Sequence, residues 1–358
     1  MLSTRVLSRI YWCRSLSTSN SLHSSAETNS ELIKKMLGYD DTNWNNEENS
    51  FLNKYDRNNI LDSYKLLKKF GYSDADIKSE LRTLCLKPQT ITSRYRMFID
   101  YCFQKDLISP TLLRHFVKTM SLNIYQIKHK GYIDKYKDVL GHVNKKLNIS
   151  VQSLSEKMPL KRIHCEFSVH HLMSVLNISH EEAKYKFKRY PNLKSRSFKC
   201  IQENVHVLTK KVGFTHERIK KNAFLLHADK ENLLSLLKKY PKMGSVDMKQ
   251  IIQAYPILVL SPIRNIESVI QCVQKFGYTL EHLSKAPMIL ILKPSTVEQR
   301  LTQIHTEEWL QPYSGLPRTL MLVLTLPSLE KRRAVLQDLN MKCISINVLA
   351  CTKILFNA

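Results

Sequence analysis

The sequence predicts an all-α protein, an α-solenoid (superhelix) of either hand built from about eight to nine three-helix repeats. One cassette recurs in a chain with only eight glycines, as Phe70-Gly71-Tyr72-Ser73, Val212-Gly213-Phe214-Thr215 and Phe276-Gly277-Tyr278-Thr279. The copies lie 142 and 64 residues apart, near multiples of a unit of roughly 32 to 36 residues. The residues between them follow helical periodicity, and strand-like alternation is scarce.

Weaker copies of the cassette fill the gaps between the three clear ones. Asn148 and Asn177 stand where glycine stood, and both residue types tolerate the left-handed conformation that closes a helix. The following Ser or Thr suits the N-cap of the next helix. With poorer copies included, the residue after each hinge falls at 72, 108, 149, 178, 214, 246, 278, 313 and 341. We expect the repeat register to be least regular near 108, 246, 313 and 341.

Each unit is predicted to contain a helix, a short second helix with a proline-containing turn, and a third helix. In the clearest unit the first helix ends at Gly277, and Thr279 caps the second. Residues 288–292 form an apolar turn, and Pro294 starts the third helix, because proline suits a helix start and not a helix interior. Residues 255–262 repeat the turn.

We predict three parts: a mitochondrial presequence at residues 1–26, a flexible polar tether at 27–59, and a helical-repeat domain at 60–358. The first 26 residues hold three arginines, eight serines and no acid, with apolar residues along one helical stripe. The candidate cleavage point follows Leu16. No stretch approaches about 20 uninterrupted apolar residues, so we expect no membrane insertion. These features predict the mitochondrial matrix.

Charge is the second strong signal. The chain has a net charge of +24, with 55 Lys and Arg against 31 Asp and Glu. Half of the excess lies between Lys184 and Lys242, where 16 basic residues face 4 acidic ones. A field of this sign attracts polyanions and steers their approach. It favours a nucleic acid partner over a surface that is merely soluble.

The motifs of common enzymes are missing from the sequence. It contains no GxGxxG, no P-loop and no HExxH. His164, Cys165, His170 and His171 cluster, but they lack the spacing of a zinc knuckle and fall on one predicted helix. The eight cysteines are scattered, which is typical of small buried hydrophobes in a reducing compartment. We expect no catalytic activity, no cofactor and no metal.

In combination these features resemble the mitochondrial transcription termination factor (mTERF) family. The resemblance rests on the cassette, on the apolar residue that follows it (Ile219 and Leu283), and on the Pro-x-Leu/Ile-Leu turn, most clearly over residues 170–305. It implies three-helix repeats arranged as a half-ring, with a basic groove that holds duplex nucleic acid. It also implies mitochondrial DNA or ribosomal RNA as the ligand, since members of the family bind one or the other.

Twelve basic residues are candidate nucleic-acid contacts. Arg94 and Arg300 each lie 22 residues after a marker and 6 after a proline, which places both at the start of a third helix. Guanidinium groups hold phosphate bidentately or reach guanine edges. The other candidates are Arg162, Arg196, Arg264, Lys199, and the pairs Lys210-Lys211, Lys220-Lys221 and Lys238-Lys239. We expect the paired lysines to contact phosphates without reading sequence. The cassette aromatics Tyr72, Phe214 and Tyr278 are expected to pack between units and not to stack on bases.

The leading hypothesis is a sequence-selective factor that binds double-stranded DNA in the matrix nucleoid and regulates transcription, as a termination roadblock or at initiation. The alternative is a ribosomal-RNA-binding factor for ribosome assembly or translation that acts with a protein partner. For that role residues 320–326 and 348–356 are candidate exposed apolar patches. A second mTERF-like factor, or a transcription or ribosome protein, is a further candidate partner. A single-strand reader is a weaker alternative, because repeats of helix pairs lack the proline-containing turn.

Overall fold

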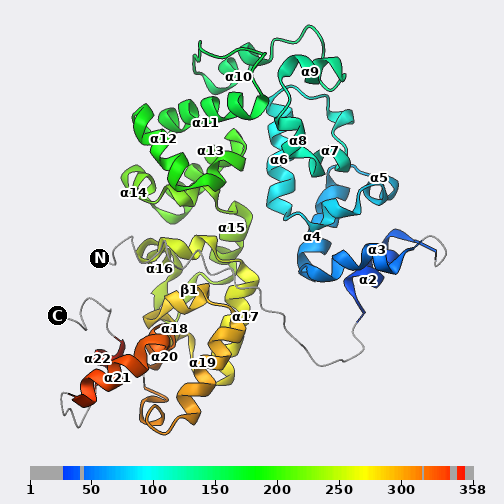
Figure 1. Cartoon of the computed structure of the whole chain (residues 1–358). Helices are drawn as coiled ribbons and strands as arrows, with labels where there is room; N and C mark the ends of the chain where they lie inside the picture. The colour runs from blue at the N-terminus through cyan, green and yellow to red at the C-terminus, as the bar shows by residue number, and fades with distance from the viewer. Residues whose placement is uncertain (1–26, 41–43, 317, 339–344, 351–358) are drawn as a thin grey trace. The chain divides into compact units, whose positions relative to one another are not determined.

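The computed structural model describes residues 27–40, 44–316, 318–338 and 345–350 (Figure 1). The expected presequence lies outside the described residues. The chain divides into two compact units at the boundary between Leu86 and Lys87. The strands described are β1 (Lys242–Met243) and β2 (Val246–Asp247), which pair as one antiparallel hairpin. All other regular elements are helical, so the predicted all-α repeat architecture is confirmed. None of the described helices has the length and apolar character that crossing a membrane requires.

The first unit contains short helices around one cassette. Its elements are α2 (Asn29–Leu37), α3 (Asn46–Asn49), η2 (Ser50–Lys54), α4 (Arg57–Lys69), α5 (Asp74–Lys78) and the 3₁₀ turn η3 (Leu81–Cys85). Here the structure differs from the sequence prediction, because α2, α3 and η2 occupy the segment expected to be a flexible tether. Ile33 and Leu52 in this segment are fully buried.

The tether prediction fails for a local reason. Asn- and Glu-rich composition usually indicates disorder, but several of these polar side chains form helix caps. Thr28 and Glu31 make a capping box at the start of α2, and Asn45 caps α3. Between the caps, Ile33 and Leu37 lie one helical turn apart and are both buried.

The second unit begins with elements of irregular length. In order these are α6 (Pro88–Asp100), η4 (Lys105–Leu107), α7 (Pro110–Arg114), α8 (Phe116–Met120), α9 (Ile124–His129), α10 (Val139–Leu147) and α11 (Leu160–Leu176). The regular part follows, with α12 (His180–Arg189), η5 (Pro191–Ser195), α13 (Phe198–Val207), the π-helical turn η6 (Leu208–Val212), α14 (His216–Lys221), η7 (Ala223–His227) and α15 (Lys230–Lys239). The chain continues with α16 (Met248–Ala254), η8 (Pro256–Leu260), α17 (Ile263–Lys275), α18 (Leu280–Lys285), η9 (Pro287–Ile291) and α19 (Pro294–Thr306). Its last described elements are η10 (Gln311–Tyr313), α20 (Thr319–Thr325), η11 (Leu326–Ser328), α21 (Leu329–Asp338) and α22 (Ile346–Ala350).

The cassette residues are helix stops, as the sequence predicts. Gly213 and Gly277 have φ of +85° and +82°, and Asn148 and Asn177 adopt the same left-handed region at +52° and +50°. After Asn177, Gly213 and Gly277 the next residue but one is the N-cap of the following helix; for example, Thr215 accepts a hydrogen bond from the amide of Arg218. The glycine or asparagine thus ends one helix, and the hydroxyl starts the next.

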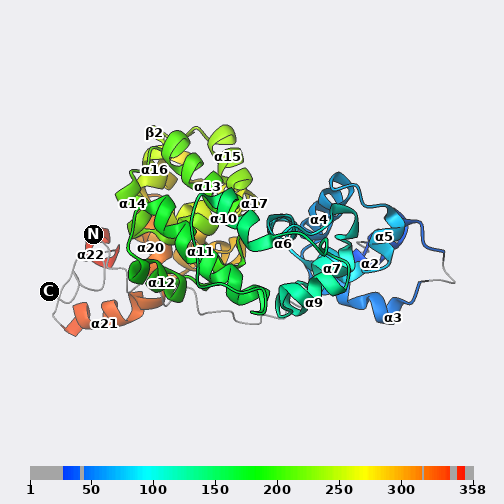
Figure 2. The same cartoon turned by 90° about the horizontal axis from the view of Figure 1, so that it is seen from above.

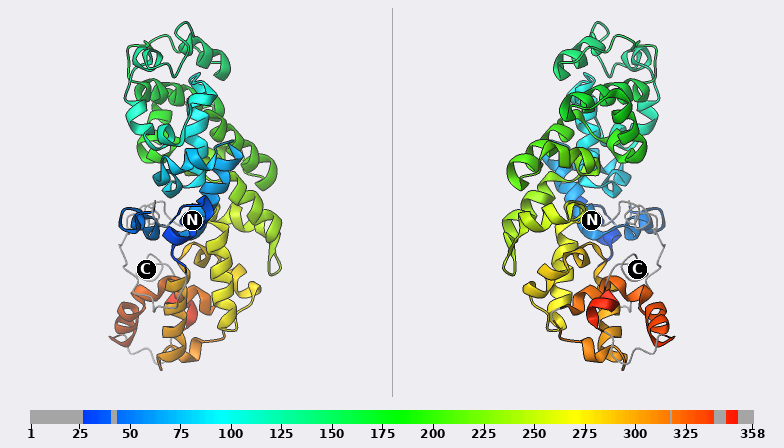
Figure 3. Two further views of the ribbon diagram at one scale, coloured as in Figure 1. Left: turned by 90° about the vertical axis from the view of Figure 1, so that its right-hand side faces the viewer. Right: turned by 90° about the vertical axis from the view of Figure 1, so that its left-hand side faces the viewer.

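The regular repeats stack in sequence order. The 3₁₀ turns η5, η7, η8 and η9 pack one on the next, and the third helices α13, α15, α17 and α19 do the same. Figure 3 shows this order as a progression of colour from green through yellow to orange over the second unit, and Figure 2 views the same elements from above. Because each third helix begins directly after its turn, all of these helices start on one edge of the stack.

In three of the third helices, one asparagine forms hydrogen bonds to the following repeat. Asn204 in α13, Asn232 in α15 and Asn265 in α17 each donate from the side-chain amide to carbonyls that close the next 3₁₀ turn. The acceptors are Leu226 and Ala228 at 2.7 and 3.0 Å, Ser261 at 2.8 Å, and Leu290 and Leu292 at 3.0 and 2.9 Å. A 3₁₀ turn leaves its final carbonyls without helical partners, so these bonds satisfy buried polar groups.

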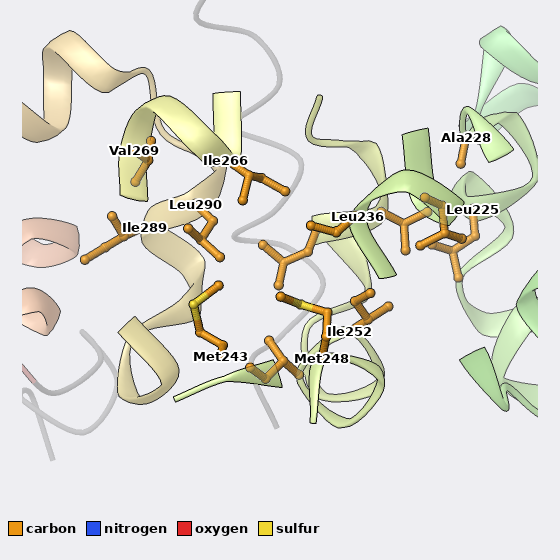
Figure 4. Packing of buried hydrophobic residues seen from close by; sticks show 14 of the residues in the cluster. Leu225, Ala228, Leu236, Met243, Met248, Ile252, Ile266, Val269, Ile289 and Leu290 are labelled. Carbon is orange, nitrogen blue, oxygen red and sulfur yellow. The ribbon is translucent and has the colours of Figure 1, made fainter. Parts of the chain in front are cut away.

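Apolar side chains from consecutive repeats form one continuous core. Leu225 from η7, Leu236 from α15, Ile266 from α17 and Leu290 from η9 are all buried in it (Figure 4). The core extends into α20, where residues 320, 322 and 323 are fully buried. The expectation of an exposed apolar patch over residues 320–326 is therefore wrong for these positions, and residues 351–356 of the other candidate patch lie outside the described residues.

Helix α6 makes a contact that the sequence does not predict. Its Ser93 hydroxyl donates to the carbonyl of Ser195 at 2.8 Å, and its Arg96 pairs with Glu203 at 2.9 Å, across more than a hundred residues of sequence. Residues 101–159 therefore leave the stack and return to it. The sequence predicts an irregular register near marker 108 but a repeat at marker 149. The buried Asp100 of α6 instead ties this excursion back through an ion pair of 2.7 Å with Lys146 of α10.

Gly244→Ala is expected to lower the free energy of unfolding by about 3 kcal/mol. Gly244 turns the β1–β2 hairpin at φ +60°, and a Cβ there would lie 2.7 Å from the Cα of Glu281, at the start of α18. Gly277 is the matched control, since it has φ +82° and open space around the same position. Gly277→Ala should cost only the backbone strain, about 1 to 2 kcal/mol. Chemical denaturation measures both values, and equal losses would contradict the role of the close approach.

Candidate nucleic-acid interface

Arg94 and Arg300 occupy equivalent places, as their spacing predicts. Arg94 in α6 donates to the carbonyl of Leu113 at 2.8 Å, and Arg300 in α19 donates to the carbonyl of Val323 at 2.7 Å. Each acceptor lies in the last two turns of a following short helix, whose final carbonyls have no partners of their own. Burial lowers the pKa of both guanidinium groups, yet they stay charged. Both side chains are half-buried and hold neighbouring elements together.

Arg196 is also held inside the fold. It donates to the side-chain oxygen of Gln89 in α6 at 2.8 Å, and its Nε is buried with no hydrogen-bond partner. Burial lowers its pKa. Three of the five predicted arginines are therefore bonded to backbone or side-chain oxygens of the chain itself, whereas Arg162 and Arg264 are exposed.

All of the predicted lysines except Lys220 are well exposed. Two of them have carboxylate partners: Lys220 pairs with Glu217 at 2.7 Å, and Lys239 pairs with Glu267. Within the described part of the chain, no carboxylate pairs with Lys199, Lys210, Lys211, Lys221 or Lys238. These five ammonium groups are available to an external anion.

The exposed cations fall on two edges of the stack, separated by the length of the third helices. The turn edge consists of residues that flank the 3₁₀ turns, namely the partly buried Lys220 and the exposed Lys188, Arg189, Lys194, Lys199, Lys221, Arg264, Lys285 and Lys293. The hinge edge consists of residues that precede or follow the other ends of these helices: Lys210, Lys211, Lys238, Lys239, Lys242 and Lys275. Helices of about ten residues hold the two edges about 15 Å apart.

The helix macrodipole affects the cations of the two edges differently. Cations in the last turn of a helix stabilise it by about 0.3 to 1 kcal/mol, and cations in the first turn oppose the dipole. Hinge-edge lysines lie mostly in last turns, as fold stability alone would favour. On the turn edge, however, Lys199, Arg264 and Lys293 lie at the first turns or N-caps of α13, α17 and α19. The helix macrodipole disfavours these three charges.

The second helices show the opposite and expected arrangement. Their first turns carry acids: Asp74 in α5, Glu181 in α12, Glu217 in α14 and Glu281 in α18. The first turns of α6, α11, α13, α17 and α19 carry no acid, while α15 has Glu231. Exposed cations at third-helix starts that carry no acid make the turn edge the stronger candidate for binding phosphates.

Five exposed cations of the turn edge were absent from the sequence-based candidates: Lys188, Arg189, Lys194, Lys285 and Lys293. Arg189, the last residue of α12, donates from Nε to the hydroxyl of Tyr190 and from a terminal nitrogen to the hydroxyl of Tyr185, both at 3.1 Å. The hydrogen bond to Tyr185 raises the pKa of this guanidinium. The i, i+4 spacing of Tyr185 and Arg189 could have revealed the contact between these two side chains.

The remaining motifs have structural roles. Phe214 and Tyr278 are buried, at 3% exposure each, which agrees with packing between units and not with stacking on bases. His164 and His171 are buried in the core beside Tyr101 and Phe198. His164 Nδ1 lies 3.0 Å from the Tyr101 hydroxyl, and His171 Nε2 donates to the Phe198 carbonyl at 3.3 Å. Both imidazoles are thus engaged within the fold.

Comparison with known proteins agrees with this geometry. The chain is 26% identical over 331 residues to transcription termination factor 5, mitochondrial, of Drosophila melanogaster, and the alignment covers 90% of this chain and 59% of that protein. The chain thus spans about three-fifths of the length of this relative. No family model and no solved structure matches the chain.

Fold and site together define an all-α helical-repeat protein with basic repeat edges. The alignment with a mitochondrial transcription termination factor agrees with the resemblance to the mTERF family that the cassette indicates.

Proposed function

We propose that this protein binds double-stranded DNA in the mitochondrial matrix along its turn edge and regulates transcription by occupying the DNA. The supporting observation is the repeated placement of cations at third-helix starts, where they oppose the macrodipole. Cations at positions that the macrodipole disfavours indicate a polyanionic partner. The name of the Drosophila melanogaster relative supports a role in mitochondrial transcription. Binding, without chemical turnover, would carry the function.

Duplex RNA is the second candidate ligand, because its phosphates attract a basic edge equally well. Ribosomal RNA bound together with a ribosome protein or a second factor would then be the biological target. Bonds within the fold occupy Arg94, Arg196 and Arg300. Contact with phosphates, which DNA and RNA duplexes both present, is therefore left to the turn-edge cations.

Binding is expected to depend steeply on salt. If roughly six to ten phosphates are neutralised, the logarithm of the association constant should fall by about 0.9 per contact for each tenfold rise in salt. Fluorescence anisotropy with labelled mitochondrial DNA fragments and with ribosomal RNA measures this slope. Full DNA binding at about 0.5 M salt, or no binding to any mitochondrial DNA fragment, would contradict the proposal. Crosslinking in mitochondria that recovers ribosomal RNA and no DNA would favour the RNA alternative.

A further inference from the structure

Arg189 differs from the other turn-edge cations because its side chain is already oriented. Two phenol hydroxyls accept hydrogen bonds from it at 3.1 Å, and its guanidinium carbon lies 5.7 Å from the centre of the Tyr190 ring. Among the described residues no carboxylate pairs with it. Two of its five N–H groups are engaged by the tyrosines, so the others are free to bind an anion.

Tyr190 anchors this arrangement to the repeat stack. Its ring is half-buried against the core, and it contacts Phe224 in the 3₁₀ turn of the next repeat, with ring centres 6.1 Å apart. Phe224 lies three residues after Lys221, an unpaired lysine of the turn edge. The contact therefore fixes the residue that follows α12 against the 3₁₀ turn that follows α14.

We propose that Arg189, held by Tyr185 and Tyr190, is a preformed clamp for one phosphate of the bound duplex. Arg189 touches the phosphate, and the two tyrosines are positioning residues. An exposed arginine ordinarily loses side-chain entropy when it orders on a ligand. The tyrosine hydroxyls restrict the side chain in advance, so Arg189 should contribute more affinity than a free lysine on the same helix. This inference rests on the proposed duplex binding and adds the residue that binds a phosphate of the nucleic acid backbone.

Charge-preserving substitutions test the clamp. Tyr185→Phe and Tyr190→Phe each keep the ring and remove one hydroxyl, leaving the net charge unchanged. In the full chain, we expect each to weaken binding of a short labelled DNA duplex by about 3- to 10-fold, consistent with loss of one hydrogen bond and of preorganisation. Arg189→Gln should weaken binding by about 10- to 30-fold and reduce the salt slope by about one. Arg189→Lys should not restore affinity, because an ammonium lacks the planar fork.

Matched controls separate the clamp from general effects. Tyr125→Phe alters a tyrosine on α9 that is as exposed as Tyr185, at 54% each, and Lys184→Gln removes one charge from the same helix. Both should leave affinity within about twofold. Thermal midpoints should be unchanged for all variants, which excludes a merely structural effect.

The outcomes are distinguishable. If the unaltered chain binds duplex while both tyrosine variants bind equally well, or if Arg189→Gln matches Lys184→Gln, the clamp is refuted and the proposed function stands. If the unaltered chain binds neither DNA nor RNA duplex, both proposals fail.

Discussion

The free energy of unfolding is expected to fall by about 4 kcal/mol when the pH is lowered from about 7 to about 5. The cause is the pair of buried imidazoles on α11. Burial lowers the pKa of His164 and of His171 from 6.5 to about 4. Burial, together with the nearby charge of Arg196, also lowers the pKa of His227 to about 4. Protonation of His227 on unfolding would add to the loss of stability.

The sign follows from which state binds the protons. In the unfolded chain both imidazoles titrate near 6.5, whereas in the folded chain they stay neutral down to about 4. Between these values the unfolded state holds more protons, so acid favours unfolding. The stability is fully present above about pH 6.5 and is lost as the pH falls toward 4. Each histidine contributes about 2 kcal/mol of loss by about pH 5.

Urea denaturation at a series of pH values measures this loss. In His171→Gln, the amide can still donate to the Phe198 carbonyl, and about 2 kcal/mol of the pH dependence should disappear. His170→Gln is the control, because His170 lies on the same helix and is only partly buried. The readout is the slope against pH and not the absolute stability of each variant. An unchanged slope in His171→Gln would refute the assignment.

Neutralising four turn-edge lysines is expected to weaken duplex DNA binding about a hundredfold and to reduce the salt slope by about 3 to 4. The change is Lys188, Lys194, Lys199 and Lys221 to glutamine. All four are exposed, and no carboxylate of the described residues pairs with them. Their loss would remove phosphate contacts from the edge where the third helices start. Fluorescence anisotropy over a range of salt concentrations gives both quantities.

The hinge edge supplies a control with the same change in charge. Substituting glutamine at Lys210, Lys211, Lys238 and Lys242 also removes four positive charges from exposed positions. Only the long-range field should weaken, so we expect a loss of a few-fold and a nearly unchanged salt slope. If the hinge-edge variant loses more affinity than the turn-edge variant, DNA binds on the hinge edge and the interface assigned here is wrong.

Sequence reasoning worked best where local chemistry decides the conformation. Gly213, Gly277 and Asn177 had to be left-handed because a helix ends there and a capped helix begins two residues later. The same reasoning failed over residues 27–59, where composition was read as disorder although Ile33 and Leu37 share a buried face. Average polarity cannot reveal one short helix with polar caps.

For the candidate site, sequence could give charge and register but not exposure. The equal offsets of Arg94 and Arg300 predicted their structural equivalence, and the structure confirms it. Their actual partners, the carbonyls of Leu113 and Val323, belong to other helices and depend on how those helices pack. Arg189 was missed for the converse reason, since its orientation needs a tyrosine ring fixed against the next repeat.

The sequence by itself determined the helical repeats, their hinges and the basic charge, because these follow from residue types at fixed local spacing. Only the tertiary structure decided which cations are free. Stacking of η5, η7, η8 and η9 places the starts of the third helices on one edge, and packing draws three predicted arginines into bonds within the fold. It also brings α6 against a repeat more than a hundred residues away. Long-range contacts of this kind depend on shape and burial summed over many residues, which no short sequence pattern encodes.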